Sequence, residues 1–143
     1  MATDKNITIH TSKGDIRLTV FASKTPVTAA SFLNLASRGF YDGLKFHRVI
    51  PDFMIQGGDP KGNGTGGSDK TIRGEFSKNG VENNISHKRG VISMARSQDN
   101  NSASSQFFIM HKDAPHLDGG YAAFGKVTEG MDVVDRFLDV PRS

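Results

Sequence analysis

Three polar side chains of this 143-residue sequence stand within apolar, strand-like stretches, where a bound ligand could meet them. They are Arg48, Gln56 and Gln106. Residues two apart in a strand share a face, so Gln106 lies on the same face as Phe108, and Gln56 on the same face as Met54. An apolar concavity with a few convergent polar groups is typical of a binding site. The pattern therefore indicates a binding groove.

A purely structural interpretation of these residues stays open. Arg48 would then pair with a surface carboxylate. Phe53, Met54 and Phe108 would be ordinary core residues, because apolar residues in strands usually belong to the core. The pattern alone does not decide between the two interpretations.

Other kinds of chemistry find less support. The sequence has no cysteine, and its histidines form no HExxH motif and no i,i+4 pair, so we expect no metal site and no cofactor. We interpret each histidine as a surface or hydrogen-bonded residue: His10, His47, His87, His111 and His116. No serine stands in a GxSxG elbow, which argues against a hydrolase triad. The run Gly62-x-Gly64-x-x-Gly67 lacks the helix that follows a nucleotide-binding motif, and it predicts a multiply turned loop.

The composition fits a single domain covering residues 1–143, because 36% hydrophobic residues supply an ordinary apolar core. A net charge of +3 is far from the concentrated charge of a nucleic-acid binder, and Lys88, Arg89 and Arg96 form no stripe with interleaved aromatics. No apolar run is long enough to span a membrane, and residues 1–9 do not have the pattern of a signal peptide. We expect a monomeric, cytoplasmic protein with no nucleic-acid or membrane partner.

Short alternating segments predict the elements that position these residues. Two alternating runs, 7–9 and 16–20, flank a turn at Gly14 and predict an antiparallel hairpin. Thr25, as the N-cap, and Pro26 open a helix that Gly39 ends, and a second helix is expected from about 130 to 138. Further β-type runs are 46–50, 54–57, 91–95, 106–110 and 122–127. The pattern predicts a mainly β fold, a closed or nearly closed antiparallel barrel with helices over its open ends.

Several longer motifs follow one another from the first hairpin to the second helix. They are Phe46-His47-Arg48-Val49-Ile50-Pro51-x-Phe53-Met54-Ile55-Gln56-Gly57-Gly58-Asp59, Gly64-Thr65-Gly66-Gly67, Ser93-Met94-Ala95, Ser105-Gln106-Phe107-Phe108-Ile109, Leu117-Asp118-Gly119 and Phe124-Gly125-Lys126-Val127-x-Glu129-Gly130-Met131. Their residue types, order and gaps resemble the signature of the cyclophilins, the peptidyl-prolyl cis–trans isomerases. The resemblance implies an eight-stranded antiparallel β-barrel capped by two α-helices, in agreement with the fold predicted from the pattern.

The resemblance also implies an activity and a site. The protein would be a peptidyl-prolyl cis–trans isomerase acting on X–Pro bonds in peptides and folding proteins, with Arg48 as the main catalytic residue, supported by Gln56. A pocket for the proline would be built from Phe53, Met54, Phe108 and Leu117. The peptide on either side of the proline would be held by Ala95, Gln106 and the backbone at Arg96. The alternative is a proline-motif binding module that uses the same groove with little turnover.

The sequence departs from the family's usual pattern in three places. Many eukaryotic members carry Trp where this chain has His116, on the rim that grips the inhibitor cyclosporin, so we expect weaker cyclosporin binding. Many members carry His near the pocket where this chain has Tyr121. The sequence ends at Ser143, before the family's usual last strand. We expect either a chain shorter than its natural length or a barrel open beside residues 7–10.

Overall fold

The computed structural model describes residues 4–11, 14–37, 39–41, 46, 48–50, 53–59, 71–72, 74–76, 79–80, 83, 85–96 and 101–137. Within these ranges the elements follow in the order β1 (Lys5–Thr11), β2 (Gly14–Val20), α1 (Pro26–Ser37), β3 (Arg48–Ile50), β4 (Met54–Gly57), β5 (Val91–Met94), β6 (Phe107–Met110), the short 3₁₀ helix η2 (Pro115–Leu117), β7 (Ala123–Glu129) and α2 (Met131–Phe137). The predicted hairpin, strands and two helices are all present, with boundaries that differ by a few residues.

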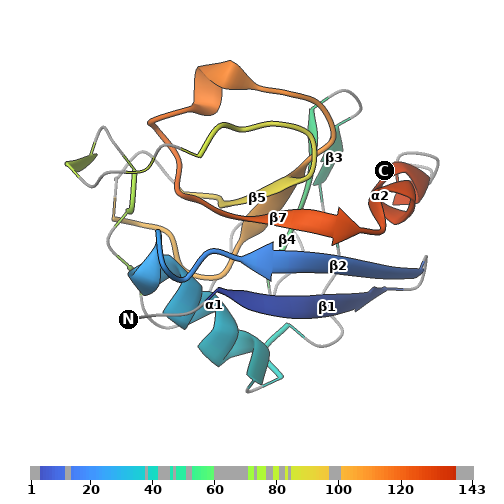
Figure 1. Ribbon diagram of the computed structural model, residues 1–143, viewed down its shortest axis with the longest axis horizontal. Helices are drawn as coiled ribbons and strands as arrows, with labels where there is room; N and C mark the ends of the chain where they lie inside the picture. The colour runs from blue at the N-terminus through green and yellow to red at the C-terminus, as the bar shows by residue number, and fades with distance from the viewer. Residues whose placement is uncertain are drawn as a thin grey trace.

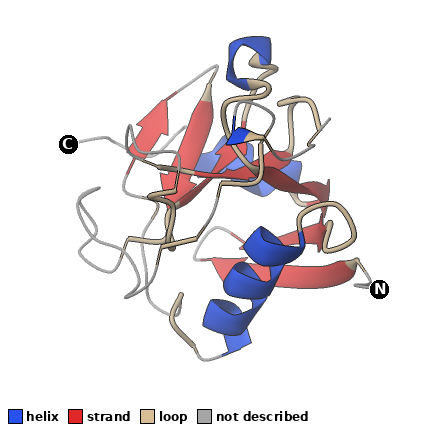
Figure 2. Cartoon of the chain, turned by 90° about the vertical axis from the view of Figure 1, so that its left-hand side faces the viewer, coloured by secondary structure: helices blue, strands red, loops and turns tan. Residues whose placement is uncertain are grey.

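The seven described strands form one curled antiparallel sheet (Figure 1). Its strand order is β1-β2-β7-β5-β6-β4-β3. Among the described strands, β1 pairs with β2 alone. The helices lie at different sides of the curl: α2 packs beside β2, and α1 runs across the opening near the N-terminus, as Figure 2 shows from the side. The mainly β fold predicted from the sequence is confirmed.

The main core fills the inside of the curl. In β2, the alternating residues Ile16, Leu18 and Val20 are buried, as the sequence pattern predicts. The ring of Phe32 in α1 packs edge-on against Phe107, with 5.6 Å between ring centroids. The helix and the sheet therefore share one apolar interior.

The predicted boundaries of α1 are correct, but its cap is not the predicted one. The helix starts at Pro26, and Gly39, with φ of +74°, follows its end. The hydroxyl of Thr25, however, donates to the carbonyl of Phe21 instead of accepting a hydrogen bond from the first turn. The backbone N–H of Thr28 donates to the carboxylate of the buried Glu75. A side chain 47 residues away thus serves as the cap, and no local pattern could predict it.

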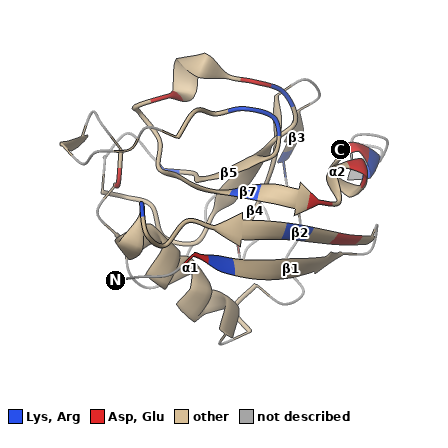
Figure 3. Cartoon of the chain, in the orientation of Figure 1, with Lys and Arg blue, Asp and Glu red and all other residues tan. Residues whose placement is uncertain are grey.

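Basic and acidic residues are interspersed among the described strands, helices and loops (Figure 3). Exposed pairs such as Arg17 with Glu129, 3.3 Å apart, place opposite charges side by side on neighbouring strands.

None of the helices in the described ranges has the length and apolar character needed to cross a membrane. His47 and most of the glycine-rich segment, including Gly62-x-Gly64-x-x-Gly67, lie outside the described residues.

Candidate active site

Cross-strand register brings the predicted polar residues into line. Arg48 on β3 lies opposite Gln56 on β4, and Gln56 lies opposite Phe108 on β6. Phe108 in turn lies opposite Ser93 on β5. Directly opposed residues point to the same face of a sheet. We call these four residues, Arg48, Gln56, Phe108 and Ser93, the outer row.

The residues one step along the same strands form a second row on the opposite face. They are Val49, Ile55, Ile109 and Ile92, here called the inner row. Ile55, Ile109 and Ile92 have no exposed surface and belong to the main core. The outer row therefore faces away from the interior of the curl, and its Arg48 and Gln56 end is open to solvent.

A separate apolar cluster lies beside the outer row. Its buried members are Met54, Val91, Phe108, Met110, Ala114, Leu117 and Ala123, with Ile50, Phe53, Ile85, Ala95 and Tyr121 partly buried against them. This outer cluster brings together the whole predicted proline pocket. Ala95 and Tyr121, which the sequence also indicates as site residues, join it. Met54 and Phe108 are 3% and 5% exposed, so their burial alone would also suit the purely structural interpretation.

The polar groups distinguish the two interpretations better. Arg48 is exposed, and it forms no ion pair with any carboxylate of the described residues. The side-chain amide of Gln56 donates from Nε2 to Oε1 of Gln106 at 2.9 Å. The surface ion pair that the structural interpretation requires is thus not seen in the described part of the chain, and two amides link β4 to the start of β6.

Aromatic contacts build the rim. The half-buried Phe53 stacks against the exposed His116 of η2, with 5.9 Å between centroids and 29° between planes. Tyr121 meets Phe108 edge to face at 5.9 Å. His116 and Tyr121, the two predicted departures from the family's usual residues, therefore both contact pocket residues.

The last two predicted residues follow β5. The backbone N–H of Ala95 donates to the carbonyl of Gln106 at 3.0 Å, which keeps the two groove residues together. Arg96 directs its guanidinium toward Tyr121 and Phe76, at 4.7 Å and 4.9 Å from the ring centroids. All predicted site residues therefore lie in the outer row, the outer cluster or direct contact with them.

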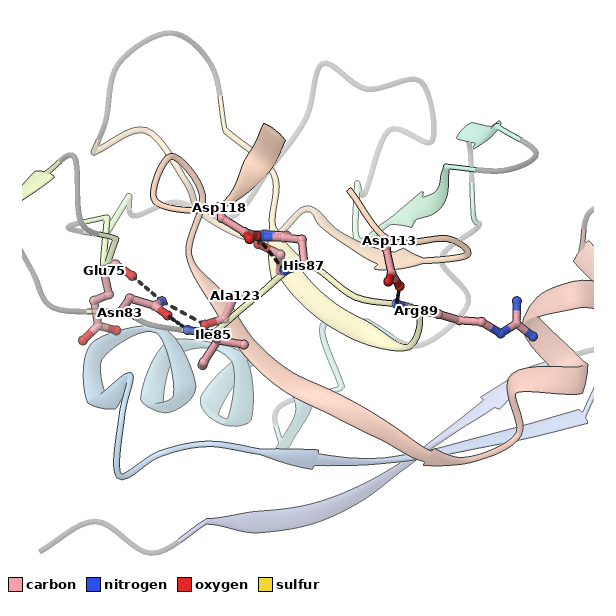
Figure 4. Close-up of polar contacts among 9 residues, drawn as sticks. Glu75, Asn83, Ile85, His87, Arg89, Asp113, Asp118 and Ala123 are labelled. Carbon is pink, nitrogen blue, oxygen red and sulfur yellow. Dashed lines mark hydrogen bonds and ion pairs between the residues drawn. The ribbon is translucent and has the colours of Figure 1, made fainter. Parts of the chain in front are cut away.

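Behind Phe108 lies a polar chain that the sequence does not predict, in which His87 and Ser93 are buried and Asp118 is exposed. Nδ1 of His87 is 2.9 Å from Oδ1 of Asp118, and Nε2 is 2.9 Å from Oγ of Ser93 (Figure 4 draws the contact with Asp118). The backbone N–H of His87 donates to the same carboxylate oxygen. Since a carboxylate only accepts, Nδ1 of the neutral ring carries the proton and donates to Asp118. The Ser93 hydroxyl then donates a hydrogen bond to Nε2.

The burial of His87 and Ser93 limits the chemistry that this polar chain can perform. The pKa of the His87 imidazole is lowered by burial, which the hydrogen bond and charge of Asp118 partly oppose. Ser93 has no exposed surface, so no substrate carbonyl can reach its hydroxyl, although the arrangement has the connectivity of a hydrolase triad. The His87 ring stacks on Phe108 at 6.1 Å and 20°. We therefore interpret the chain as support for the pocket floor, formed by residues too far apart in sequence to make a motif.

No group of three or more His, Asp or Glu side chains in the described part of the chain could hold a metal ion. The site offers an exposed guanidinium, two linked amides and an apolar cluster. Such a site can bind a partly apolar ligand and donate hydrogen bonds to it.

Known proteins are similar to this chain in fold and in sequence. The family model of the cyclophilin type peptidyl-prolyl cis-trans isomerases matches residues 6–143. Peptidyl-prolyl cis-trans isomerases of Arabidopsis thaliana and Helicobacter pylori are 46% and 47% identical over 131 residues, which cover 91% and 90% of this chain and 80% and 77% of theirs. A Cryptosporidium parvum cyclophilin type isomerase, crystallised in the presence of the dipeptide Ala-Pro, superposes with a TM-score of 0.89 at 33% identity, over 97% of this chain and 88% of its own.

The chain belongs to the cyclophilin family, and it is a peptidyl-prolyl cis–trans isomerase. The resemblance inferred from the sequence motifs is confirmed, and so is the isomerase class.

Proposed function

We propose that the outer row and the outer cluster form the site where this isomerase binds and twists X–Pro bonds in peptides and folding proteins. One observation carries the proposal: Arg48, Gln56 and Phe108 occupy directly opposed positions on three neighbouring strands. A donor, an amide and an apolar floor therefore stand side by side on one face. The Ala-Pro dipeptide named with the Cryptosporidium parvum structure supports a proline-containing ligand.

The reaction needs no bond to be broken. Rotation about an X–Pro bond has a barrier of ~20 kcal/mol, because amide resonance holds the bond planar. In the twisted state the prolyl nitrogen becomes pyramidal and regains its lone pair. A catalyst must therefore bind this twisted state more tightly than the planar one. That requirement suits a site made of hydrogen-bond donors and an apolar pocket.

The outer cluster would fix the pyrrolidine ring. Phe53, Met54, Phe108 and Leu117 would surround it, with Phe108 held from behind by His87. Anchoring the ring on one side of the bond lets the rest of the peptide turn against it. The proline ring would thus stay fixed in the outer cluster while the peptide on the other side of the bond rotates.

Arg48 would then stabilise the twisted amide. Its guanidinium is always charged and presents a rigid fork of donors, which can hydrogen-bond as the twist develops. Gln56 supports it from the opposed position on β4, while Ala95, Gln106 and the backbone at Arg96 hold the flanking peptide. Lowering the barrier by about 7 kcal/mol would accelerate rotation by roughly five orders of magnitude.

The cellular role that we propose is assistance to folding proteins, chaperone-like, by a cytoplasmic monomer. The absence of cysteine from the sequence suits a reducing compartment and is the support for that location. Cell fractionation and sedimentation of the purified protein test location and oligomeric state.

A titration of the ¹⁵N-labelled protein with a short Ala-Pro peptide tests the site, and exchange spectroscopy on the same samples measures turnover. We expect the largest amide shifts in β3, β4, β6 and η2, together with accelerated exchange between the cis and trans signals of the peptide. A shallow hollow lined by Asn6, Arg17 and Thr128 is the internal control, because it lies beside β1 and β2, away from the outer row. Larger shifts there than in the outer row would contradict the proposed site.

A further inference from the structure

The side chain of Arg96 points toward two aromatic rings. Its guanidinium carbon lies 4.9 Å from the ring centroid of Phe76 and 4.7 Å from that of Tyr121. Both distances are within the range in which a cation is attracted to an aromatic face. Arg96 is only partly exposed, which strengthens such contacts relative to those in free solvent.

The same guanidinium holds a backbone carbonyl. Nε and Nη2 of Arg96 both donate to the oxygen of Gly120, at 3.1 Å and 2.6 Å. Gly120 ends a turn in which its own N–H donates to the carbonyl of Leu117 at 3.1 Å. Arg96 therefore holds the far end of the segment 117–121 against the residues that follow β5.

That segment supplies two residues of the outer cluster. Leu117 is one of its buried members, and Tyr121 packs partly buried against it. Tyr121 also meets the Phe108 ring edge to face at 5.9 Å. A change at Arg96 can therefore reach the proline pocket by two routes, through the turn to Leu117 and through the Tyr121 ring to Phe108.

We propose that the Arg96 side chain is a positioning residue: it fixes the segment 117–121 and thereby sets the width of the proline pocket. This role is distinct from the peptide contact proposed for the Arg96 backbone, and it rests on the proposed function of the outer cluster. The side chain acts without touching the proline.

The chemistry of the contact requires arginine. A planar guanidinium can face an aromatic ring and at the same time send two donors to one carbonyl. Lysine offers a compact ammonium that can keep the attraction to a ring but lacks the planar two-donor fork. Arg96→Lys should therefore restore only part of what Arg96→Ala removes.

The test compares Arg96→Ala, Arg96→Lys and the control Arg89→Ala in the full chain. Arg89 also donates to a backbone carbonyl, that of His111 at 2.9 Å, but its guanidinium pairs with Asp135 of α2 instead of with the pocket segment. Circular dichroism and thermal unfolding first establish that each variant is folded. The readouts are kcat and KM for an Ala-Pro peptide, and the methyl signals of Leu117 without peptide.

We expect Arg96→Ala to lower kcat/KM about tenfold, mainly through KM, because a displaced pocket wall seats proline less well. The Leu117 methyl signals should shift, and Arg96→Lys should lie between Arg96→Ala and the wild type on both readouts. Arg89→Ala should leave both unchanged. Tyr121→Leu removes one of the two rings that Arg96 faces. The decrease in kcat/KM of the double variant should therefore be smaller than the two single decreases combined.

Two results would overturn the proposal, and they differ in what else they reject. Unshifted Leu117 signals with a wild-type KM in folded Arg96→Ala would reject the positioning role alone. Shifted Leu117 signals with a wild-type KM would show that this segment does not form the proline pocket, which rejects the proposed site and the role of Arg96 together.

Discussion

The inner row and the outer row lie on the same four strands and differ by one register step. Three members of the inner row are isoleucines without exposed surface, whereas the outer row runs from the exposed Arg48 to the buried Ser93. A shift of one residue exchanges the two faces of a strand. The hydrogen bonds that keep the core in register therefore keep the site in the same register.

The two rows also differ in how they satisfy polar groups. The inner row presents only aliphatic side chains to the core. The outer row contains polar side chains, and its buried one, Ser93, is paired with His87. Unpaired buried polar groups are costly, so this pairing allows a polar chain behind the site. One set of strands thus carries core residues on one face and the proposed site on the other, and each variant below changes one of the two faces.

Arg48→Ala gives the largest expected effect on the outer row alone. Loss of one donor to the twisted amide should lower kcat/KM by two to three orders of magnitude, about 3–4 kcal/mol. The melting temperature should stay near that of the wild type, because Arg48 is exposed and has no described ion-pair partner. Arg48→Lys should recover part of the activity, since an ammonium lacks the planar fork. Measuring turnover and unfolding on the same samples checks the loss of activity and the unchanged melting temperature together. Near wild-type turnover would exclude Arg48 as the catalyst.

Ile109→Val is the complementary change on the inner row. Removing one buried methylene at a site with no exposed surface should lower the free energy of unfolding by about 1 kcal/mol. Turnover should stay close to that of the wild type below the melting range, because the side chain points away from the outer row. Denaturant unfolding and the isomerase assay measure the two effects. A loss of activity larger than tenfold, in protein shown to be folded, would mean that the rows are not independent.

We expect the His87 imidazole, which packs behind the outer row, to make the free energy of unfolding depend on pH. Its pKa is lowered in the folded chain, first by burial, whereas in the unfolded chain it titrates near its ordinary value of about 6.5. Between these two values the unfolded chain binds more protons. The stabilisation is therefore fully present above about pH 6.5 and is lost as the pH falls toward the lower, folded value.

Melting temperatures measured over this range for the wild type and His87→Gln test the assignment. His87→Gln should flatten the decrease on the acid side. Equal slopes for the two proteins would assign the acid sensitivity to other groups.

The sequence predicts the strands of the site well, because alternation and glycine turns are local signals. Parity alone places Gln56 with Met54 and Gln106 with Phe108. The register shows Met54, Gln56 and Phe108 on the outer face, and Gln106 joins them through its hydrogen bond with Gln56. The position of Phe53 beside them follows only from the resemblance to cyclophilins, since parity would put it on the other face. The family and its activity are likewise recognised from motif order, not from periodicity.

What the sequence could not predict are contacts between distant, individually ordinary residues. Glu75 caps α1 across 47 residues, and His87 joins Asp118 across 31. In isolation, a buried glutamate or histidine in a loop gives no periodic signal. Their roles depend on which segments the curled sheet brings together, which is a property of the tertiary fold.

The smallest expected effect concerns the rim of the outer cluster, where we propose that cyclosporin binds weakly. His116 stacks on Phe53, but it is exposed and its ring nitrogens resist burial against an apolar inhibitor. His116→Trp adds apolar area at this position and should tighten cyclosporin binding roughly threefold, about 0.6 kcal/mol of added burial. The inner row is untouched, so the melting temperature should not change. Calorimetric titration of both proteins measures the difference, with Lys112→Ala as a surface control on the neighbouring segment. An unchanged or weaker affinity of His116→Trp would show that this edge of the outer cluster does not contact the inhibitor.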